Sequence, residues 1–204
     1  MKNKIIAVIG AGGKTTLIHR LAEEYRRKGA SVLVSTTTHM LVEPDTDLSC
    51  DSFAIMEKIK KTGYCMAGAV CPENSAKMQS LPEQMLHDLM KQVDYALIVA
   101  DGAKHYALKY PSEQEPVIPE GTTDVILVLG SWDLGKPCKD VVFRFEHMTS
   151  ALGISGDMKA DKQMLQWIWQ AYEEKLKNMD YQGHFHVLLS EKTDQGIMFH
   201  TLEE

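Results

Sequence analysis

The chain has 204 residues, of which 22 are lysine or arginine and 28 are aspartate or glutamate, and its formal net charge is −6 at neutral pH. This acidic balance lacks the broad positive field with which nonspecific nucleic-acid-binding proteins hold phosphate backbones, so we expect no nucleic-acid partner. No apolar run approaches the roughly 20 residues of a membrane span, and we expect a cytoplasmic protein without a membrane partner.

The cysteines are scattered along the chain without a CxxC pair, at Cys50, Cys65, Cys71 and Cys138. A chain of this length can bury a sufficient core without disulfides, so reduced thiols are expected. A weaker alternative is that Cys65 and Cys71 bind a soft metal ion. Their six-residue spacing, with no histidine nearby, is a poor match to known ligand patterns.

Alternating apolar and amphipathic segments predict an open, mostly parallel sheet. An apolar run at 4–9 ends in glycines, residues 15–28 place apolar side chains on one helical face, and a second apolar run follows at 31–35. These segments form a β-α-β unit, for which a right-handed crossover is expected. The further expected elements are a helix at 52–61, a strand at 64–70, a helix with Pro82 in its first turn, strands at 95–99 and 124–129, a helix at 160–179, a strand at 185–189 and a short polar tail.

This order of elements predicts the fold class. We expect an α/β protein that resembles P-loop NTPases, with a mostly parallel sheet and helices on both of its faces. No internal repeat or low-complexity linker interrupts the chain. We therefore expect a single nucleotide-binding domain over residues 1–204 with irregular insertions.

The strongest motif is Gly10-Ala11-Gly12-Gly13-Lys14-Thr15-Thr16, which follows the first strand and opens the first helix. Backbone amides of such a loop, together with the helix N-terminus, can gather phosphate oxygens. Glycines allow backbone angles that other residues avoid, Lys14 offers a positive charge, and Thr15 offers a hydroxyl to Mg²⁺. The motif predicts a nucleotide site with Mg²⁺.

The spacing of this loop differs from the common Walker pattern. The position six residues before the lysine, where that pattern has its first glycine, is Val8. The shorter GxxGKT spacing resembles the phosphate loop of the Mur ligase family of ATP-dependent amide-forming enzymes. The structural alternative is a glycine-rich turn in which Lys14 is solvated and Thr15 caps the helix.

Polar residues follow other predicted strands. Asp101 ends the strand at 95–99, where it could hold Mg²⁺ or its waters. The residues Thr36-Thr37-Thr38-His39 follow the second strand, and His39 could act as a base. Since ligands of open α/β sheets lie at the carboxyl ends of strands, Gly10, residues 35–39, Asp101 and Gly130 should converge on one crevice. The alternative for Asp101 is a turn residue before Gly102, and for the threonines a β-branched strand end.

A polar loop follows Asp101 and contains Lys104, Lys109 and the sequence EPVIP at 115–119. Its lysines could hold an anionic substrate or the transferred phosphate. Its prolines restrict the backbone. The alternative for each lysine is a solvated surface residue.

Three motifs occur in a fixed order: VIGAGGKTT near the start, STTTHM after the second strand, and ADGAKHYALKYPSEQEPVIP in the middle. Together they resemble the YqeC family, whose members are associated with selenium cofactor biosynthesis. The resemblance spans most of the chain and implies a nucleotide-binding fold and an accessory role in the maturation of selenium-dependent molybdenum hydroxylases.

The resemblance also implies roles by motif position. Residues 10–16 would bind phosphate, and Thr37, Thr38 and His39 would line the site. The candidate catalytic residues are Lys14, His39, Asp101, Lys104, Lys109 and Glu115, and the candidate metal ligands are Thr15 and Asp101. Two positions depart from the family pattern: Val99 stands where an acidic residue is common, and Gln114 where a histidine is expected.

The nucleotide expected is ATP, with GTP as the alternative. Residues 191–194, EKTD, resemble the guanine-reading NKxD element, but Glu191 replaces the amide residue that would contact the base. Three functions remain open: a nucleoside triphosphatase or phosphoryl transferase, a nucleotide-switched binding module or metallochaperone that docks to a hydroxylase, and a Mur-like ligase. The expected partners are the nucleotide and either a small anionic substrate or the hydroxylase.

Overall fold

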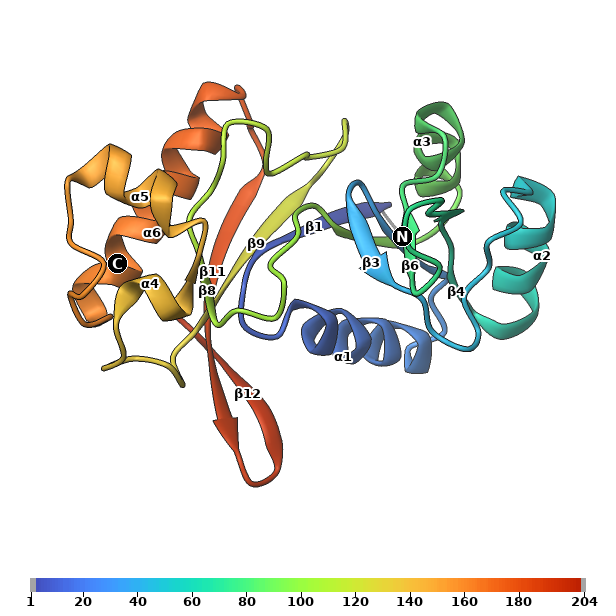
Figure 1. Ribbon diagram of the computed structural model, residues 1–204. Coiled ribbons are helices and arrows are strands. Elements are labelled where there is room, and N and C mark those ends of the chain that lie inside the picture. The colour runs from blue at the N-terminus through green and yellow to red at the C-terminus, as the bar shows by residue number, and fades with distance from the viewer. Residues whose placement is uncertain (1–2, 203–204) are drawn as a thin grey trace. The chain divides into compact units, whose positions relative to one another are not determined.

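The computed structural model describes residues 3–202 (Figure 1). The helices are α1 (Lys14–Arg27), α2 (Ser52–Thr62), α3 (Glu83–Lys91), α4 (Cys138–Val141), α5 (Phe145–Leu152) and α6 (Lys162–Asn178). The strands are β1 (Lys4–Gly10), β2 (Val32–Thr36), β3 (His39–Leu41), β4 (Tyr64–Met66), β5 (Ala69–Val70), β6 (Lys77–Gln79), β7 (Tyr95–Val99), β8 (Leu108–Lys109), β9 (Asp124–Gly130), β10 (Val142–Phe143), β11 (His184–Thr193) and β12 (Gly196–Thr201).

The described chain divides into two compact units. The first contains residues 3–8, 15–102 and 117–124, and the second contains residues 9–14, 103–116 and 125–202. Each unit has its own strands and helices, as described below. The single nucleotide-binding domain expected over residues 1–204 stays a prediction.

The first unit contains a parallel sheet with strand order β1-β7-β2-β4. The strands are almost wholly buried and apolar, as expected of parallel strands that are covered on both faces. Ala96 and Ile98 of β7 belong to a core cluster with apolar residues of α2 and α3. Because side chains alternate along a strand, Tyr95 points to the opposite face, where its ring stacks on Tyr25 of α1 at 3.7 Å. The predicted parallel sheet with helices on both faces is thus present in this unit.

A small antiparallel sheet, β3-β6-β5, also belongs to the first unit and was not predicted. The strand predicted at 64–70 is wrong in its extent, because β4 pairs with β2 whereas β5 pairs with β6. The chain changes sheets at Gly68. A Cβ atom there would lie 2.6 Å from Sδ of Met78 and 3.0 Å from the carbonyl oxygen of Gln79, so a larger residue would require these neighbours to shift.

The second unit contains β9, β11 and β12, in the order β12-β11-β9, and α4, α5 and α6. The polar tail expected at the C-terminus is wrong: residues 196–201 form β12, which pairs with β11 in an antiparallel hairpin. The predicted helix at 160–179 is confirmed as α6, whose N-cap Asp161 accepts a hydrogen bond from the backbone N of Met164 at 3.0 Å. Strand β8 pairs in parallel with β10.

Among residues 3–202, no helix combines the length and the apolar character that crossing a membrane requires.

Candidate functional site

The predicted phosphate loop joins β1 to α1. Strand β1 ends at Gly10 and α1 begins at Lys14. The φ angles of Gly10, Gly12 and Gly13 are +87°, +86° and +108°, in the region that glycine adopts most readily. Ala11 is fully buried, and its backbone N–H donates to the carbonyl of Val128 on β9 at 2.9 Å. The expected strand, loop and helix are therefore confirmed at this position.

Besides allowing unusual backbone angles, two glycines of the loop are required by close packing against β9. A Cβ atom on Gly10 would lie 2.4 Å from the carbonyl oxygen of Val128, and one on Gly12 would lie 2.5 Å from the backbone N of Gly130. Both glycines therefore let the loop backbone approach β9 of the second unit. Of the residues expected to converge on one crevice, Gly130 does lie against this loop.

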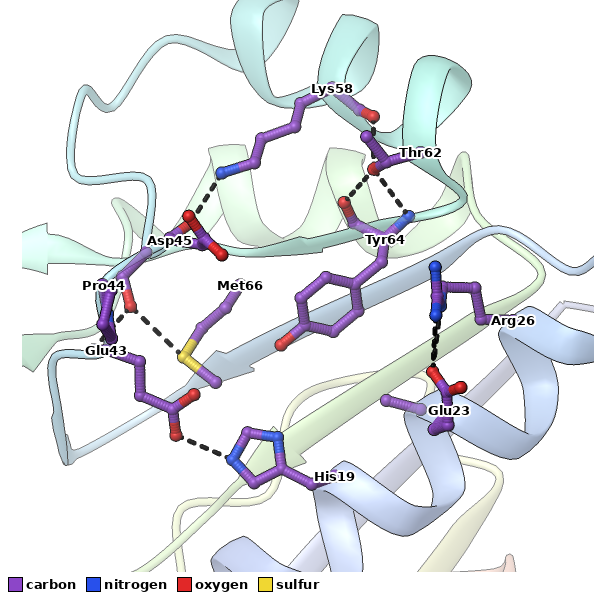
Figure 2. A pocket seen from close by; sticks show the side chains of 12 residues that line it. His19, Glu23, Arg26, Glu43, Pro44, Asp45, Lys58, Thr62, Tyr64 and Met66 are labelled. Atoms are coloured by element: carbon purple, nitrogen blue, oxygen red, sulfur yellow. Dashed lines mark hydrogen bonds and ion pairs between the residues drawn. The ribbon is translucent and has the colours of Figure 1, made fainter.

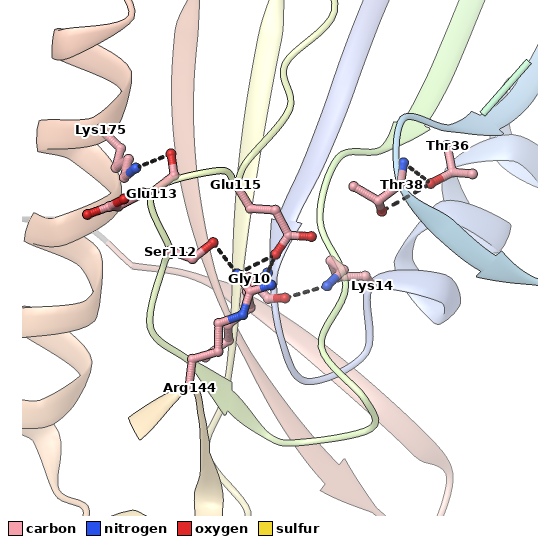
Figure 3. Close-up of polar contacts among 10 residues, drawn as sticks. Gly10, Lys14, Thr36, Thr38, Ser112, Glu113, Glu115, Arg144 and Lys175 are labelled. Atoms are coloured by element: carbon pink, nitrogen blue, oxygen red, sulfur yellow. Dashed lines mark hydrogen bonds and ion pairs between the residues drawn. The ribbon is translucent and has the colours of Figure 1, made fainter. Parts of the chain in front are cut away.

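Lys14 is buried, with 8% of its surface exposed. Its ammonium group Nζ folds back over the loop and donates to the carbonyl of Gly10 (Figure 3). This placement contradicts the alternative in which Lys14 is a solvated residue of a simple turn. Thr15, in the first turn of α1, is exposed, and Thr16 is half-buried.

The C-terminal hairpin contacts the glycine-rich loop, and sequence reasoning missed this contact. The hydroxyl of Ser190 on β11 is fully buried and donates to the carbonyl of Gly12. A Cβ atom on Gly13 would lie 3.2 Å from Cδ1 of Ile197 and 3.5 Å from Cζ of Phe199, both on β12. The sequence signal for this strand was the short apolar run Ile197-Met198-Phe199, which is weak.

In the first unit, the ends of three parallel strands meet at one edge of the sheet. Val99 on β7 lies opposite Val8 on β1 and opposite Thr36 on β2. Ala100 donates to the carbonyl of Val8 at 3.1 Å. The next residue, Asp101, is fully buried directly beyond this strand end, as its predicted position requires. A buried carboxylate is costly unless it is compensated, which is more typical of a functional or paired group than of an open turn.

The threonines after β2 make backbone contacts. Thr36 donates from Oγ1 to the carbonyl of Val99 at 2.8 Å and accepts from the backbone N of Thr38 at 3.0 Å (Figure 3). Thr37 donates from Oγ1 to the carbonyl of Val117 at 2.7 Å. These hydroxyls hold the strand end in place. His39 is exposed on β3, and its role as a base stays a prediction.

The loop at 103–116 carries the predicted residues Lys104, Lys109 and Glu115 in the second unit. Lys109 is fully buried, and its Nζ lies 2.7 Å from Oε2 of Glu115. Arg144, which sequence reasoning missed, also places its Nη1 2.7 Å from the same oxygen (Figure 3). Lys104 is exposed. The alternative of a solvated surface residue is therefore wrong for Lys109, and the exposure of Lys104 agrees with it.

A pocket of about 640 Å³ lies in the first unit between α1, residues 43–46 and β4 (Figure 2). His19 of α1 places Nε2 2.7 Å from Oε1 of Glu43 at this pocket. Burial raises the pKa of Tyr64 to about 12. The lining of the pocket mixes acids such as Glu23 with bases such as Lys58.

Cys65 and Cys71 were the candidate ligands of a soft metal ion. Cys65 and Cys71 are both buried, and among residues 3–202 no group of three or more histidine, cysteine, aspartate or glutamate side chains is arranged to hold a metal ion. Burial raises the pKa of Cys65 to about 11.

Residues 191–194, which resemble the guanine-reading element, form the end of β11 and the hairpin turn. Nζ of Lys192 lies 4.5 Å from the ring centroid of Trp132.

Together these features describe a mixed α/β protein in which a glycine-rich loop with a buried lysine joins the first strand to the first helix. Residues 6–146 match the family described as YqeC protein, and the chain therefore belongs to the YqeC family. It is 33% identical over 161 residues to the uncharacterized protein YqeC of Escherichia coli strain K12. The match covers 75% of this chain and 62% of that relative, so the chain spans less than two thirds of the length of the relative. No solved structure matches the chain significantly.

Proposed function

We propose that this chain is a P-loop, nucleotide-dependent accessory protein, acting with ATP and Mg²⁺ in selenium cofactor biosynthesis for selenium-dependent molybdenum hydroxylases. The observation that carries the nucleotide part is the buried ammonium of Lys14, folded over a loop with three positive-φ glycines. The pathway part rests on membership in the YqeC family and on the order of the three sequence motifs.

The position of Lys14 suits a phosphate-binding group. Removing an ammonium from water costs free energy, so a buried ammonium needs acceptors close to it. A phosphate oxygen would give the same ammonium a charged acceptor, and charge-assisted hydrogen bonds are roughly twice as strong as neutral ones. Replacement of the Gly10 carbonyl by a phosphate would therefore be favourable.

The residues present also fit a magnesium ion. The exposed hydroxyl of Thr15 lies in the first turn of α1, and the carboxylate of Asp101 lies buried beyond β7. Hydroxyl and carboxylate oxygens are ligands that Mg²⁺ prefers. When bound with a nucleotide, Mg²⁺ neutralises charge on the phosphate oxygens. Thr15 and Asp101 would hold and orient the ion, while Lys14 would stabilise charge that develops on the transferred phosphoryl group.

The proposed reaction class is nucleoside triphosphate hydrolysis or phosphoryl transfer. Lys109 and Glu115 would position a second substrate, and His39 is the candidate base. Ser190 would act as a positioning residue, since its hydroxyl holds the carbonyl of Gly12 inside the loop. ATP is proposed over GTP because the guanine-reading element lacks its amide residue at Glu191.

A second candidate is a nucleotide-switched binding module. The contacts of Ser190 with Gly12, and of Ile197 and Phe199 with Gly13, favour it. A nucleotide that shifts the loop would also change the packing of the β11–β12 hairpin, and the hairpin could report occupancy to a protein partner. Binding of ATP without phosphate release in the isolated protein would favour this module over the enzyme.

Calorimetric titration with ATP and GTP, each with and without Mg²⁺, followed by measurement of phosphate release, tests the nucleotide proposal. We expect Lys14→Ala to weaken Mg·ATP binding by at least about tenfold, the loss of one charge-assisted contact. Lys28→Ala is the matched control, because Lys28 lies just after α1, is exposed and pairs with Glu24. Undiminished affinity in the Lys14 variant would overturn the proposal.

The pathway proposal needs a cellular test. We expect deletion of the gene to lower the activity of a selenium-dependent molybdenum hydroxylase, and the intact gene, but not one encoding Lys14→Ala, to restore it. Full hydroxylase activity in the deletion strain would contradict the proposed role.

A further inference from the structure

The pocket of the first unit has the size of a small-molecule site. Its volume is about 640 Å³, and sites for small organic ligands measure about 300 to 1,000 Å³. The ring of Tyr64 and the thioether of Met66 lie at its middle, with His19 of α1 and Lys58 of α2 on two of its sides (Figure 2). The pocket thus offers an aromatic and apolar surface surrounded by polar groups, and the proposed nucleotide function uses none of these residues.

The hydroxyl of Tyr64 is available to a ligand. Figure 2 shows it directed into the space between Met66 and His19, and it makes no hydrogen bond to any of residues 3–202. Burial, and to a smaller extent the carboxylate of Glu43, raises the pKa of Tyr64 to about 12. The phenol therefore keeps its proton near neutral pH and can donate to a nitrogen or oxygen of a ligand.

Glu43 supplies an acceptor at the same pocket. Its Oε1 lies 2.7 Å from Nε2 of His19, whereas no donor within residues 3–202 contacts its Oε2. The Glu43 side chain is 36% exposed, so a ligand can reach this second oxygen. A carboxylate oxygen accepts an N–H more strongly than a neutral oxygen does, because the hydrogen bond is charge-assisted. A hydroxyl donor and a carboxylate acceptor thus face one cavity.

The turn that carries Glu43 is held in place by the protein. The backbone N of Glu43 donates to Oγ1 of Thr46 at 2.9 Å, and the backbone N of Thr46 donates to the carbonyl of Glu43 at 3.0 Å. Oγ1 of Thr46 donates to Sδ of Met66 at 3.4 Å, and Nζ of Lys58 donates to the carbonyl of Asp45 at 2.6 Å (Figure 2). Because these contacts tie the turn to β4 and α2, a ligand would have to order few groups on binding.

The cations of the lining do not favour an anionic ligand. Nη2 of Arg26 lies 2.8 Å from Oε2 of Glu23, and Lys58 donates to the carbonyl of Asp45. The carboxylates of Glu43 and Asp45 belong to the same lining and would repel a negative charge. The pocket therefore suits a neutral or cationic ligand that carries an N–H donor.

We propose that this pocket binds an amino-substituted nitrogen heterocycle through its N=C–NH₂ edge. The ring nitrogen of that edge would accept from the hydroxyl of Tyr64, and the amino group beside it would donate to Oε2 of Glu43. The planar ring would pack against the thioether of Met66 and the ring of Tyr64, since sulfur and aromatic surfaces both favour such contacts. This site shares no residue with the loop at 10–16 and does not depend on the proposed nucleotide function.

Titration of the full chain with 2-aminopyrimidine, followed by backbone amide shifts in NMR spectra, tests this site. We expect saturable shifts at residues 43–46 and 64–66, and about fivefold weaker binding of pyrimidine, which lacks the amino donor. Tyr64→Phe removes only the hydroxyl and should weaken 2-aminopyrimidine binding about fivefold. Tyr106→Phe is the matched control, because Tyr106 lies outside the pocket, and it should leave this affinity within about twofold.

A second variant keeps the test decisive if Tyr64→Phe unfolds the protein. Glu43→Gln should change the circular dichroism melting curve little, because the pair with His19 is partly exposed. It should still weaken 2-aminopyrimidine binding by about fivefold, since the charged acceptor is lost. Unchanged affinity in every folded variant, or equal binding of pyrimidine, would overturn the site. So would the absence of saturable binding up to about 10 mM.

Titrations with Mg·ATP separate this site from the nucleotide proposal. Lys14→Ala should leave the affinity for 2-aminopyrimidine within about twofold, and Tyr64→Phe should leave the affinity for Mg·ATP within about twofold. Binding of 2-aminopyrimidine by a native protein that does not bind Mg·ATP would support this site and contradict the nucleotide proposal alone. A parallel loss of both affinities in Tyr64→Phe would overturn the assignment of a separate site.

Discussion

The hydroxyl of Ser190 donates to the carbonyl of Gly12, and the same oxygen lies 3.2 Å from the carbonyl of Leu129. Ser190 and Gly12 are 178 positions apart in the chain. The contact joins the C-terminal hairpin to the loop that opens α1, and it gives the hairpin a direct influence on the shape of the loop.

Replacing Ser190 with alanine should lower the free energy of unfolding by about 1 to 3 kcal/mol, because the buried carbonyl of Gly12 loses a donor. Urea unfolding monitored by tryptophan fluorescence measures this change. Ser150→Ala is the matched control and should change stability little, because Ser150 is exposed and its hydroxyl donates to the carbonyl of Glu146 within α5. Equal unfolding midpoints for the two variants would show that the Ser190 contact is unimportant.

Gly12→Ala should destabilise the protein much more than Gly29→Ala. Both glycines have φ near +80° to +86°, but a Cβ atom on Gly29 would meet nothing within 4 Å, whereas one on Gly12 would clash with Gly130. We expect about 1 kcal/mol for Gly29→Ala from the backbone conformation, and roughly 3 kcal/mol or more for Gly12→Ala. Denaturant unfolding of both variants measures the difference, and similar losses would argue against close packing of the loop on β9.

Asp94 should contribute pH-dependent stability. The backbone N and hydroxyl of Ser31 each donate to Oδ2 of Asp94 at 2.8 Å, and these bonds lower the pKa of that carboxyl. A lowered folded-state pKa means that the contribution is present above the ordinary pKa near 3.9 and is lost as the pH falls through the folded value.

Asp94→Asn should therefore cost about 1 kcal/mol at pH 7, and less as the pH drops below about 4. Urea unfolding across this range gives the comparison. Asp157→Asn is the control: Asp157 pairs with Lys139 at 2.7 Å on the surface, and we expect no measurable change. A cost of Asp94→Asn that stays constant from pH 7 to pH 3 would contradict the expected linkage.

The cysteines should differ sharply in reactivity. Cys50 is half-exposed, whereas Cys65, Cys71 and Cys138 are buried, and burial raises the pKa of Cys65 to about 11. At pH 8 only roughly one in a thousand Cys65 thiols would be ionised, even apart from its lack of access. Ellman's reagent should modify one thiol quickly in the native protein and four after denaturation, and Cys50→Ser should remove the fast phase. Rapid modification of Cys65 would indicate that β4 opens readily.

The local patterns of the chain were sufficient to predict much of the framework. Apolar runs predicted β1, β2, β7 and β9, and an apolar stripe predicted α6. These predictions were possible because the periodicity of a helix or strand is a property of residues that are close in the sequence. The glycine-rich loop stood out as a motif for the same reason, because its glycines, Lys14 and Thr15 lie close together in the sequence, and its phosphate-binding role stays a prediction. The burial of Asp101 also agrees with its place directly after a buried strand.

Only the tertiary structure decided which distant segments meet. Residues 64–70 are divided between two sheets because β4 pairs with β2 whereas β5 pairs with β6, and β12 forms by pairing with β11. Arg144 meets Glu115 across 29 positions, and Ser190 meets Gly12 across 178. Periodicity and spacing describe residues that are near one another in the chain, whereas strand pairing, burial and ion pairing depend on chain closure over long distances, for which no local pattern exists.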